Sequence, residues 1–394
     1  MLVSPFHKYI HGPALDFEKP ICDVLLKRGQ PEGQLASLRP ALRALTDMRS
    51  RCGPPSGMPA RDNLYRYYRH LCAFEAFVEP LGGLVAEAKL AFQWTDTLTP
   101  APPAPGDLQF EKACVLWQMM ASEAKEALRL DMAGSRQETL VAKVKAMKRA
   151  WGASDALLAL VQHVQTPLRP ESDLGRASLN YFHSLFVAQT HALQMEYVED
   201  LKRAELSNRE TGPSNKETEK AYLEVAGFAL QASEFFDATS KCGLAPESLK
   251  RFPWQHFTVL QRHYFLARAC EAKAETFTAR ARRIGEGSGE AASWYLVAER
   301  EVQSALGVLR ACDAARAAKA CETSLDGPVI DRTLAVLATS IASLARQHRS
   351  DAETVYSEAV YTDWRATRLT ELCTSGPVDP ASGTRGPHVK VVVR

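Results

Sequence analysis

Residues 92–117 read FQWTDTLTPAPPAPGDLQFEKACVLW, and this stretch decides the fold. It opens with the alternation of a short strand, so we expect a strand at residues 89–98. Four prolines then stop any regular element, and helical spacing resumes in a helix expected at residues 108–130. Phe92 and Trp94 share one face of the strand because side chains two apart point the same way. We expect both rings to pack with that helix in one small core.

Helical periodicity dominates the rest of the chain. Further helices are expected at residues 60–78, 137–165, 174–206, 254–283, 290–320 and 329–346. Ser214 and Glu217 have the capping-box spacing that starts one more helix. Residues 21–29 and the VKVVV segment near the end are weaker strand candidates. Long helices joined by short polar turns are typical of antiparallel hairpins stacked as in helical solenoids, and we expect one continuous domain.

Composition argues against several classes of protein. The chain has 394 residues, 46% of them hydrophobic and 24% charged, which is an ordinary globular balance. Lys and Arg number 48 against 46 Asp and Glu, so the net charge of +2 gives no overall attraction to nucleic acid. Nine cysteines, an odd count without a C-x-x-C pair, favour a reduced, cytoplasmic protein. We expect neither a signal peptide nor a membrane span, because no apolar run has the required length.

The sequence shows no pattern that assembles a catalytic or metal site. His183 and His191 are eight residues apart on one expected helix, which is not a metal-ligand spacing. The GEGSG segment at residues 285–289 lacks the order of a phosphate-binding loop and follows no strand. We therefore expect a helical scaffold with no cofactor, no metal and no enzymatic activity.

The run KVKAMKRA places Lys143, Lys145, Lys148 and Arg149 on one expected helix. Such a run attracts an acidic partner or an anionic membrane surface. The alternative, which the sequence favours, is a solvated helix face. Acidic residues are sparse around the run, so both interpretations stay open.

Several segments together carry a family resemblance. They are FQWTDTL followed by FEKACVLW, then LYRYYRHLCAFE, WGASDALLAL, LFVAQTHALQMEY, ASEFFDAT and TVYSEAV. In order and spacing they resemble the Bro domain family, the boomerang-shaped domain of Alix, Brox, rhophilin and the His-domain phosphatase. The resemblance implies a Bro-like domain at residues 1–380 and a tail at residues 381–394. It also implies a mainly α fold: an elongated boomerang of long antiparallel helices with a solenoid-like hairpin core and a small β-sheet.

This resemblance implies a protein-binding function. Bro domains are adaptors of the ESCRT system. A groove on the domain takes up a C-terminal amphipathic helix of an ESCRT-III core subunit, in endosomal sorting or membrane remodelling. Recognition of this kind places apolar anchors in a hydrophobic trough flanked by charge. The expected location is the cytoplasm, with recruitment to endosomal membranes.

The resemblance also implies where the groove lies in this chain. Phe228 takes a groove position that is usually Leu, Leu372 matches a Leu that closes one end, and Lys143 matches a basic groove residue. Gln194 and Glu224 stand where relatives have apolar residues, and a buried, unpaired Glu is costly. Either the partner helix is adapted to them, or the chain is a Bro-like scaffold for a different partner: cytoskeletal, GTPase or signalling.

Tyr356, in the segment ETVYSEAV, matches a family tyrosine that is phosphorylated in some relatives. The resemblance therefore implies a phosphorylation site. The simpler alternative is a ring that packs on the last helix. A phosphate would add negative charge beside Glu353 and Glu358 and would disturb such packing.

Overall fold

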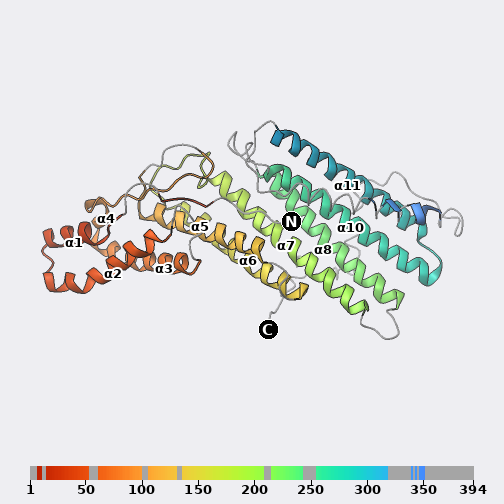
Figure 1. Cartoon of the computed structure of the whole chain (residues 1–394), viewed down its shortest axis with the longest axis horizontal. Helices are drawn as coiled ribbons and strands as arrows, with labels where there is room; N and C mark the ends of the chain where they lie inside the picture. The colour runs from red at the N-terminus through yellow and green to blue at the C-terminus, as the bar shows by residue number, and fades with distance from the viewer. Residues whose placement is uncertain are drawn as a thin grey trace, which may run out of the picture.

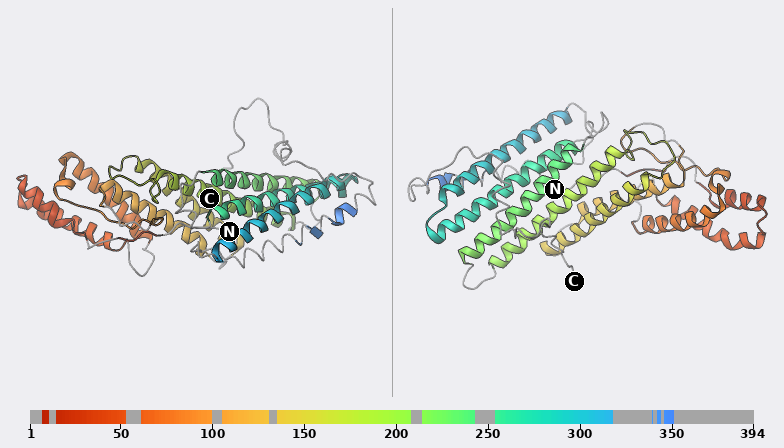
Figure 2. Two further views of the ribbon diagram at one scale, coloured as in Figure 1. Left: turned by 90° about the horizontal axis from the view of Figure 1, so that it is seen from above. Right: turned by 180° about the vertical axis from the view of Figure 1, so that it is seen from behind.

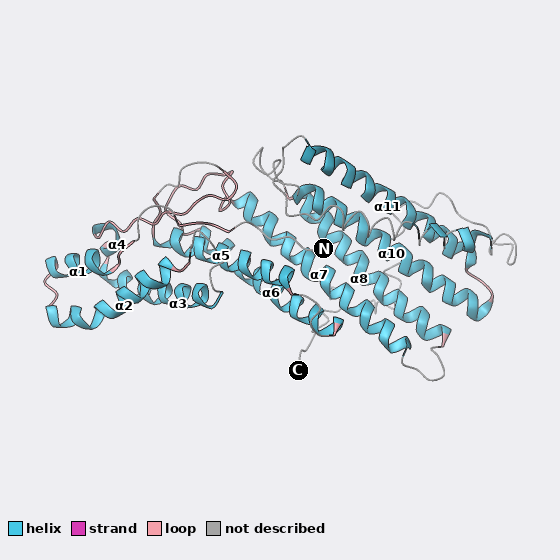
Figure 3. Cartoon of the chain, viewed as in Figure 1, coloured by secondary structure: helices cyan, strands magenta, loops and turns pink. Residues whose placement is uncertain are grey.

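The computed structural model describes residues 7–10, 15–52, 61–99, 105–130, 135–207, 214–242, 254–317, 339, 342–343 and 346–350. Most of these residues are helical, and Figure 3 shows no strand among them. The prediction of a mainly α protein built from helical hairpins is confirmed.

The shorter helices form one end of the elongated molecule (Figure 1, red to orange). They are α1 (Glu18–Lys27), α2 (Glu32–Ser50), α3 (Arg61–Val78), the 3-10 helix η1 (Glu79–Leu81) and α4 (Leu84–Glu87). The longer helices are α5 (Leu108–Arg129), α6 (Arg136–Val161), α7 (Arg176–Ser207), α8 (Asn215–Lys241), α10 (Trp254–Ile284) and α11 (Ser288–Ala317).

The long helices pack in the order in which the chain makes them. Helix α5 packs on α6, α6 on α7, α7 on α8, α8 on α10 and α10 on α11. The views in Figures 1 and 2 show them side by side and inclined together across the molecule. Sequential neighbours in contact are what short turns between antiparallel helices produce.

The predicted strand at residues 89–98 is wrong. Only two isolated antiparallel bridges occur there, Phe92 with Gly106 and Trp94 with Ile10. The first bridge cannot extend past Gly106 because α5 begins at Leu108 and takes up the backbone groups that a ladder would need. The weaker strand candidate at residues 21–29 is also wrong, since most of it lies in α1. The VKVVV segment lies outside the described residues.

The small core predicted around the opening motif is confirmed. Phe92, Trp94, Cys114 and Trp117 are all buried, with at most 1% of each exposed. Trp117 meets the edge of Phe182 on α7, with ring centroids 5.3 Å apart. The strand-like alternation therefore predicted correctly which side chains are buried, although no β-ladder forms.

Helix starts follow their caps. Ser214 and Glu217 form the predicted capping box at the start of α8, with the Glu217 amide donating to Ser214 Oγ. At α5, Asp107 accepts from the Phe110 amide at 2.7 Å and from the Gln165 amide at 2.8 Å. One carboxylate thus caps α5 and holds the chain that follows α6.

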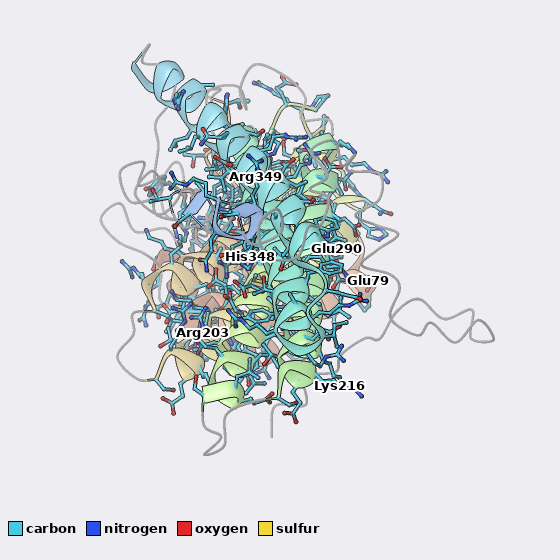
Figure 4. All side chains as sticks on the ribbon, turned by 90° about the vertical axis from the view of Figure 1, so that its right-hand side faces the viewer. Glu79, Arg203, Lys216, Glu290, His348 and Arg349 are labelled. Atoms are coloured by element: carbon cyan, nitrogen blue, oxygen red, sulfur yellow. The ribbon has the colours of Figure 1, made fainter. Side chains whose placement is uncertain are left out.

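Described helical residues lie beyond the predicted end of the last helix. Residues 346–350 are helical, beyond the expected end at 346. His348 is buried there against α10 and α11 (Figure 4): its ring stacks on Tyr295 at 5.2 Å, and its Nε2 lies 3.3 Å from Thr278 Oγ1.

Candidate protein-binding site

The acidic residue of the opening motif serves the fold. Glu111 is fully buried in α5 and accepts three hydrogen bonds. Arg49 Nε donates at 3.0 Å, the Tyr67 hydroxyl at 2.8 Å and Trp94 Nε1 at 2.6 Å. One carboxylate therefore ties α2, α3 and the 92–94 segment to α5. The cluster is buried and closed to a ligand, so the binding surface lies elsewhere on the molecule.

A line of partly exposed side chains follows the contact between α7 and α8. We call this line the α7–α8 seam. It comprises His191, Gln194, Val198 and Lys202 on α7 and Glu224, Phe228, Gln231 and Phe235 on α8. Each helix contributes residues three or four apart, which is the spacing of one helix face. Every one of these side chains is half-buried or exposed.

Two contacts fix the register of the seam. Lys202 Nζ lies 3.2 Å from Glu224 Oε2 at one end. At the other end His191 and Phe235 stack nearly parallel, with ring centroids 4.3 Å apart. The residues that make the two contacts are separated by the same number of positions on α7 as on α8. The antiparallel pair therefore stays in register over the roughly 16 Å between the contacts.

The seam brings three of the predicted site residues together. Gln194 lies on α7, and Glu224 and Phe228 lie on α8, all between the two contacts that fix the register or at one of them. Phe228 is half-buried and packs on the main core. Sequence reasoning missed Val198 and Phe235, although their spacing of four from Gln194 and of seven from Phe228 would have found them.

Glu224 is neither buried nor unpaired in the structure. Its side chain is 43% exposed and forms an ion pair with Lys202, which also lies 3.2 Å from Glu205. The pairing partner is 22 residues away in sequence, so helical spacing alone could not reveal it. The carboxylate becomes costly only when a ligand covers it and removes its water.

Lys143 and Lys148 lie on different sides of α6. Lys143 precedes the buried residues Ala146 and Met147 by three and four positions, so it lies on the stripe of α6 that packs inward. Lys148 is exposed, and its charge acts on His191. The two lysines are about 140° apart around the helix. Lys148 is the one whose charge reaches the seam, and Lys143 as a groove residue stays a prediction. Leu372 and Tyr356 lie outside the described residues.

Burial is the main influence on the protonation of His191. It lowers the pKa of His191 from the ordinary value of 6.5, and the Lys148 ammonium lowers it further. The neutral ring is the form that suits a stack against Phe235, half-covered by two helices.

We expect the free energy of unfolding to decrease as the pH falls below about 6.5. The unfolded chain takes up a proton at His191 more readily than the folded chain, so acid favours unfolding. The variant His191→Phe keeps an aromatic stack and removes the proton site, and its stability should decrease less with acid. Urea unfolding at a series of pH values from 8 to 5 measures both slopes. Equal slopes would contradict a neutral, stacked His191.

No group of three or more metal-ligating side chains occurs in the part of the chain that the structure describes. Among those same residues, no helix is long and apolar enough to cross a membrane. The cysteines whose side chains the structure describes are free: Cys22, Cys52, Cys72, Cys114, Cys242 and Cys270.

Long helices in sequential contact around one main core define a helical scaffold. The sequence matches the BRO1-like domain family over residues 1–382. The chain belongs to this family, whose members are non-catalytic scaffolds, and the predicted family is confirmed.

Similarity to curated relatives is partial. Mouse Rhophilin-1 is 29% identical over 177 residues, which is 44% of this chain and 26% of that protein. Human Rhophilin-1 is 29% identical over 184 residues, which is 46% of this chain and 26% of that protein. Each match spans about a quarter of the length of the curated relative.

Solved structures share the fold. The ALIX BRO1 CHMP4C complex superposes with a TM-score of 0.67 at 16% identity, covering 91% of this chain and 90% of that chain. ALIX in complex with the SIVmac239 PYKEVTEDL late domain gives 0.67 at 16% identity, with 92% and 46% covered. A Bro1 domain described for its role in endosomal targeting gives 0.63 at 13% identity, with 93% and 91% covered. At these identities the likeness establishes the fold alone.

Proposed function

We propose that this chain is a non-enzymatic adaptor whose α7–α8 seam binds a C-terminal amphipathic helix of an ESCRT-III core subunit. The observation that carries the proposal is the seam itself: eight partly exposed side chains at helical spacing, held in register over two helices. Fold similarity to an ALIX BRO1 domain in complex with CHMP4C supports this choice of partner. Adaptor function in endosomal sorting or membrane remodelling, from a cytoplasmic location, follows from that partner.

The seam suits a helix of mixed character. Val198, Phe228 and Phe235 offer half-buried apolar surface, which matches the apolar anchors of an amphipathic helix. Gln194 and Glu224 interrupt this surface. A ligand helix that covers them must supply a hydrogen-bond donor or a cation opposite each, because an unmatched polar group loses its water without compensation. We therefore expect a ligand with Lys, Arg or a polar residue at two of its inward positions.

The double variant Gln194→Phe with Glu224→Ile should bind a standard, apolar ESCRT-III tail helix at least about tenfold more tightly than the parent. Each substitution adds buried apolar area worth about 1.5–3 kcal/mol when fully covered, of which only a part appears as affinity. Lys202 keeps Glu205 as a partner, so the change leaves no isolated charge. Fluorescence anisotropy with a labelled tail-helix peptide measures the dissociation constant.

The matched control is Gln34→Phe with Glu32→Ile on the exposed face of α2, far from the seam along the chain. It adds the same apolar groups and should leave peptide binding unchanged. If the seam variant and the control behave alike, the seam is not where the helix binds. A non-specific gain in hydrophobic binding would raise the peptide affinity of both variants. A specific site raises only the affinity of the seam variant.

A second candidate partner is a Rho-family GTPase, favoured by the match to Rhophilin-1. Binding of this chain to a GTPase loaded with GTP or with GDP, measured beside the tail-helix peptide, separates the two partners. Tight GTPase binding without any peptide binding would replace the ESCRT-III proposal.

A further inference from the structure

A second buried carboxylate lies away from the seam, between α3, α5 and α6. Glu123 on α5 is fully buried. Its Oε2 accepts from Arg149 Nε on α6 at 2.8 Å, and its Oε1 accepts from the Tyr65 hydroxyl on α3 at 2.9 Å. Arg61 Nε, at the start of α3, lies 3.7 Å from the same Oε1. One carboxylate therefore holds two arginines from two different helices.

Both arginines remain partly in water. The side chain of Arg61 is 44% exposed and that of Arg149 is 42% exposed. Each makes its closest approach to Glu123 through Nε, so the η nitrogens of both arginines lie farther from this carboxylate. A guanidinium held at Nε presents its remaining N–H donors as a planar fork, the geometry that fits a phosphate.

Positive side chains outnumber the acids that pair with them around the two arginines. Glu123 neutralises one of them, and Asp62, 3.9 Å from Arg61, is an exposed acid nearby. Lys145 lies one turn before Arg149 on α6, and Arg69 lies two turns after Arg61 on α3. Both are exposed, and neither has an acid within ion-pair distance among the described residues. The result is a strip of basic side chains along two helices.

Tyr65 keeps the site in one protonation state. Burial, and then the Glu123 charge, raises the pKa of the Tyr65 hydroxyl to about 12. The hydroxyl therefore donates to Glu123 at every physiological pH, and the carboxylate keeps its place between the arginines. Glu123 is a positioning residue here, because it touches the arginines and not the ligand.

We propose that Arg61 and Arg149 bind the phosphomonoester headgroup of an anionic phospholipid at a membrane surface, with Arg69 and Lys145 contacting neighbouring headgroups. A membrane fits better than a single phosphorylated peptide because the basic side chains extend along two helices, for about 12 Å of α3 and about 6 Å of α6. A surface of many phosphates engages such a strip at once, and each Lys or Arg near it adds to the binding. This site is separate from the seam and does not depend on the partner proposed there.

The test is sedimentation of the full chain with phosphatidylcholine vesicles that contain either phosphatidylserine or a phosphatidylinositol phosphate. The double variant Arg61→Gln with Arg149→Gln should bind the phosphoinositide vesicles about 25-fold more weakly, at roughly fivefold for each charge removed. Its loss on phosphatidylserine vesicles should be smaller, since that lipid has no phosphomonoester for the fork. Arg282→Gln, an exposed arginine on α10, is the matched control and should bind as the parent does.

Two further variants keep the test decisive if the first fails to fold. Arg61→Lys with Arg149→Lys keeps the charge and removes the fork, and it should lose the preference for the phosphoinositide. Arg69→Gln with Lys145→Gln touches no buried carboxylate and should weaken binding to both kinds of vesicle. Parent-like binding in all of these variants would overturn the proposal. The proposal would also be overturned if the chain bound soluble inositol phosphate or a phosphopeptide strongly and did not bind vesicles.

Discussion

Replacing Glu111 by Ala is expected to lower the free energy of unfolding by about 3–5 kcal/mol, because it leaves Arg49 as a buried cation without its partner. Arg49 is only 3% exposed, and its Nε lies 3.0 Å from Glu111. Tyr67 and Trp94 lose their hydrogen-bond acceptor at the same time. Equilibrium unfolding in urea, followed by circular dichroism, measures the loss.

The matched control is Glu126→Ala, a half-buried glutamate on the same helix. It removes the same atoms and should cost less than about 1 kcal/mol. Glu111→Gln should fall between the two, since the amide still accepts a hydrogen bond but brings no charge to Arg49. A cost for Glu111→Ala as small as that of the control would show that the three hydrogen bonds contribute little.

Removing one partner of the buried pair Lys8–Asp173 is expected to cost about 3–5 kcal/mol as well. Lys8 Nζ lies 2.6 Å from Asp173, and the two side chains are 2% and 1% exposed. Burial alone would lower the pKa of Lys8, but the Asp173 charge and hydrogen bond outweigh it and the pKa is raised. The folded protein therefore holds the ammonium, and either single substitution strands one charge in the interior.

A double-mutant cycle separates the pair from its surroundings. Lys8→Met and Asp173→Asn should each destabilise strongly, whereas the double variant should cost less than the sum by about 1–3 kcal/mol. Some loss remains in the double variant because Asp173 also accepts from the Thr97 amide and hydroxyl. Additive losses in urea unfolding would mean that the two charges do not stabilise each other.

The helices could be predicted from the sequence because their signals are local. Apolar spacing and the Ser214–Glu217 capping box depend only on neighbours within a turn, and both are present in the structure. The strand at residues 89–98 failed for the opposite reason. A ladder needs a partner, and the partner segment after the prolines enters α5 within two residues of Gly106.

The site was harder to predict than the fold. The resemblance placed Gln194, Glu224 and Phe228 on one surface, and the α7–α8 contacts bring them together. The sequence shows that Lys143 shares a stripe of α6 with Ala146, Met147 and Ala150, and its place in the groove stays a prediction. It could not reveal the ion pair between Lys202 and Glu224, because that pair depends on how two helices are set against each other.

Sequential packing of α5, α6, α7, α8, α10 and α11 limits how far along the molecule a destabilising substitution acts. In such an array each helix is stabilised by the one before and the one after, so the free energy approximates a sum of nearest-neighbour couplings. A destabilising substitution in α11 then lowers mainly the stability of α10, and its effect on the stability of α7 is small. The two ends of the molecule can accumulate substitutions independently, and a partner can be lost from one surface while the remainder keeps its shape.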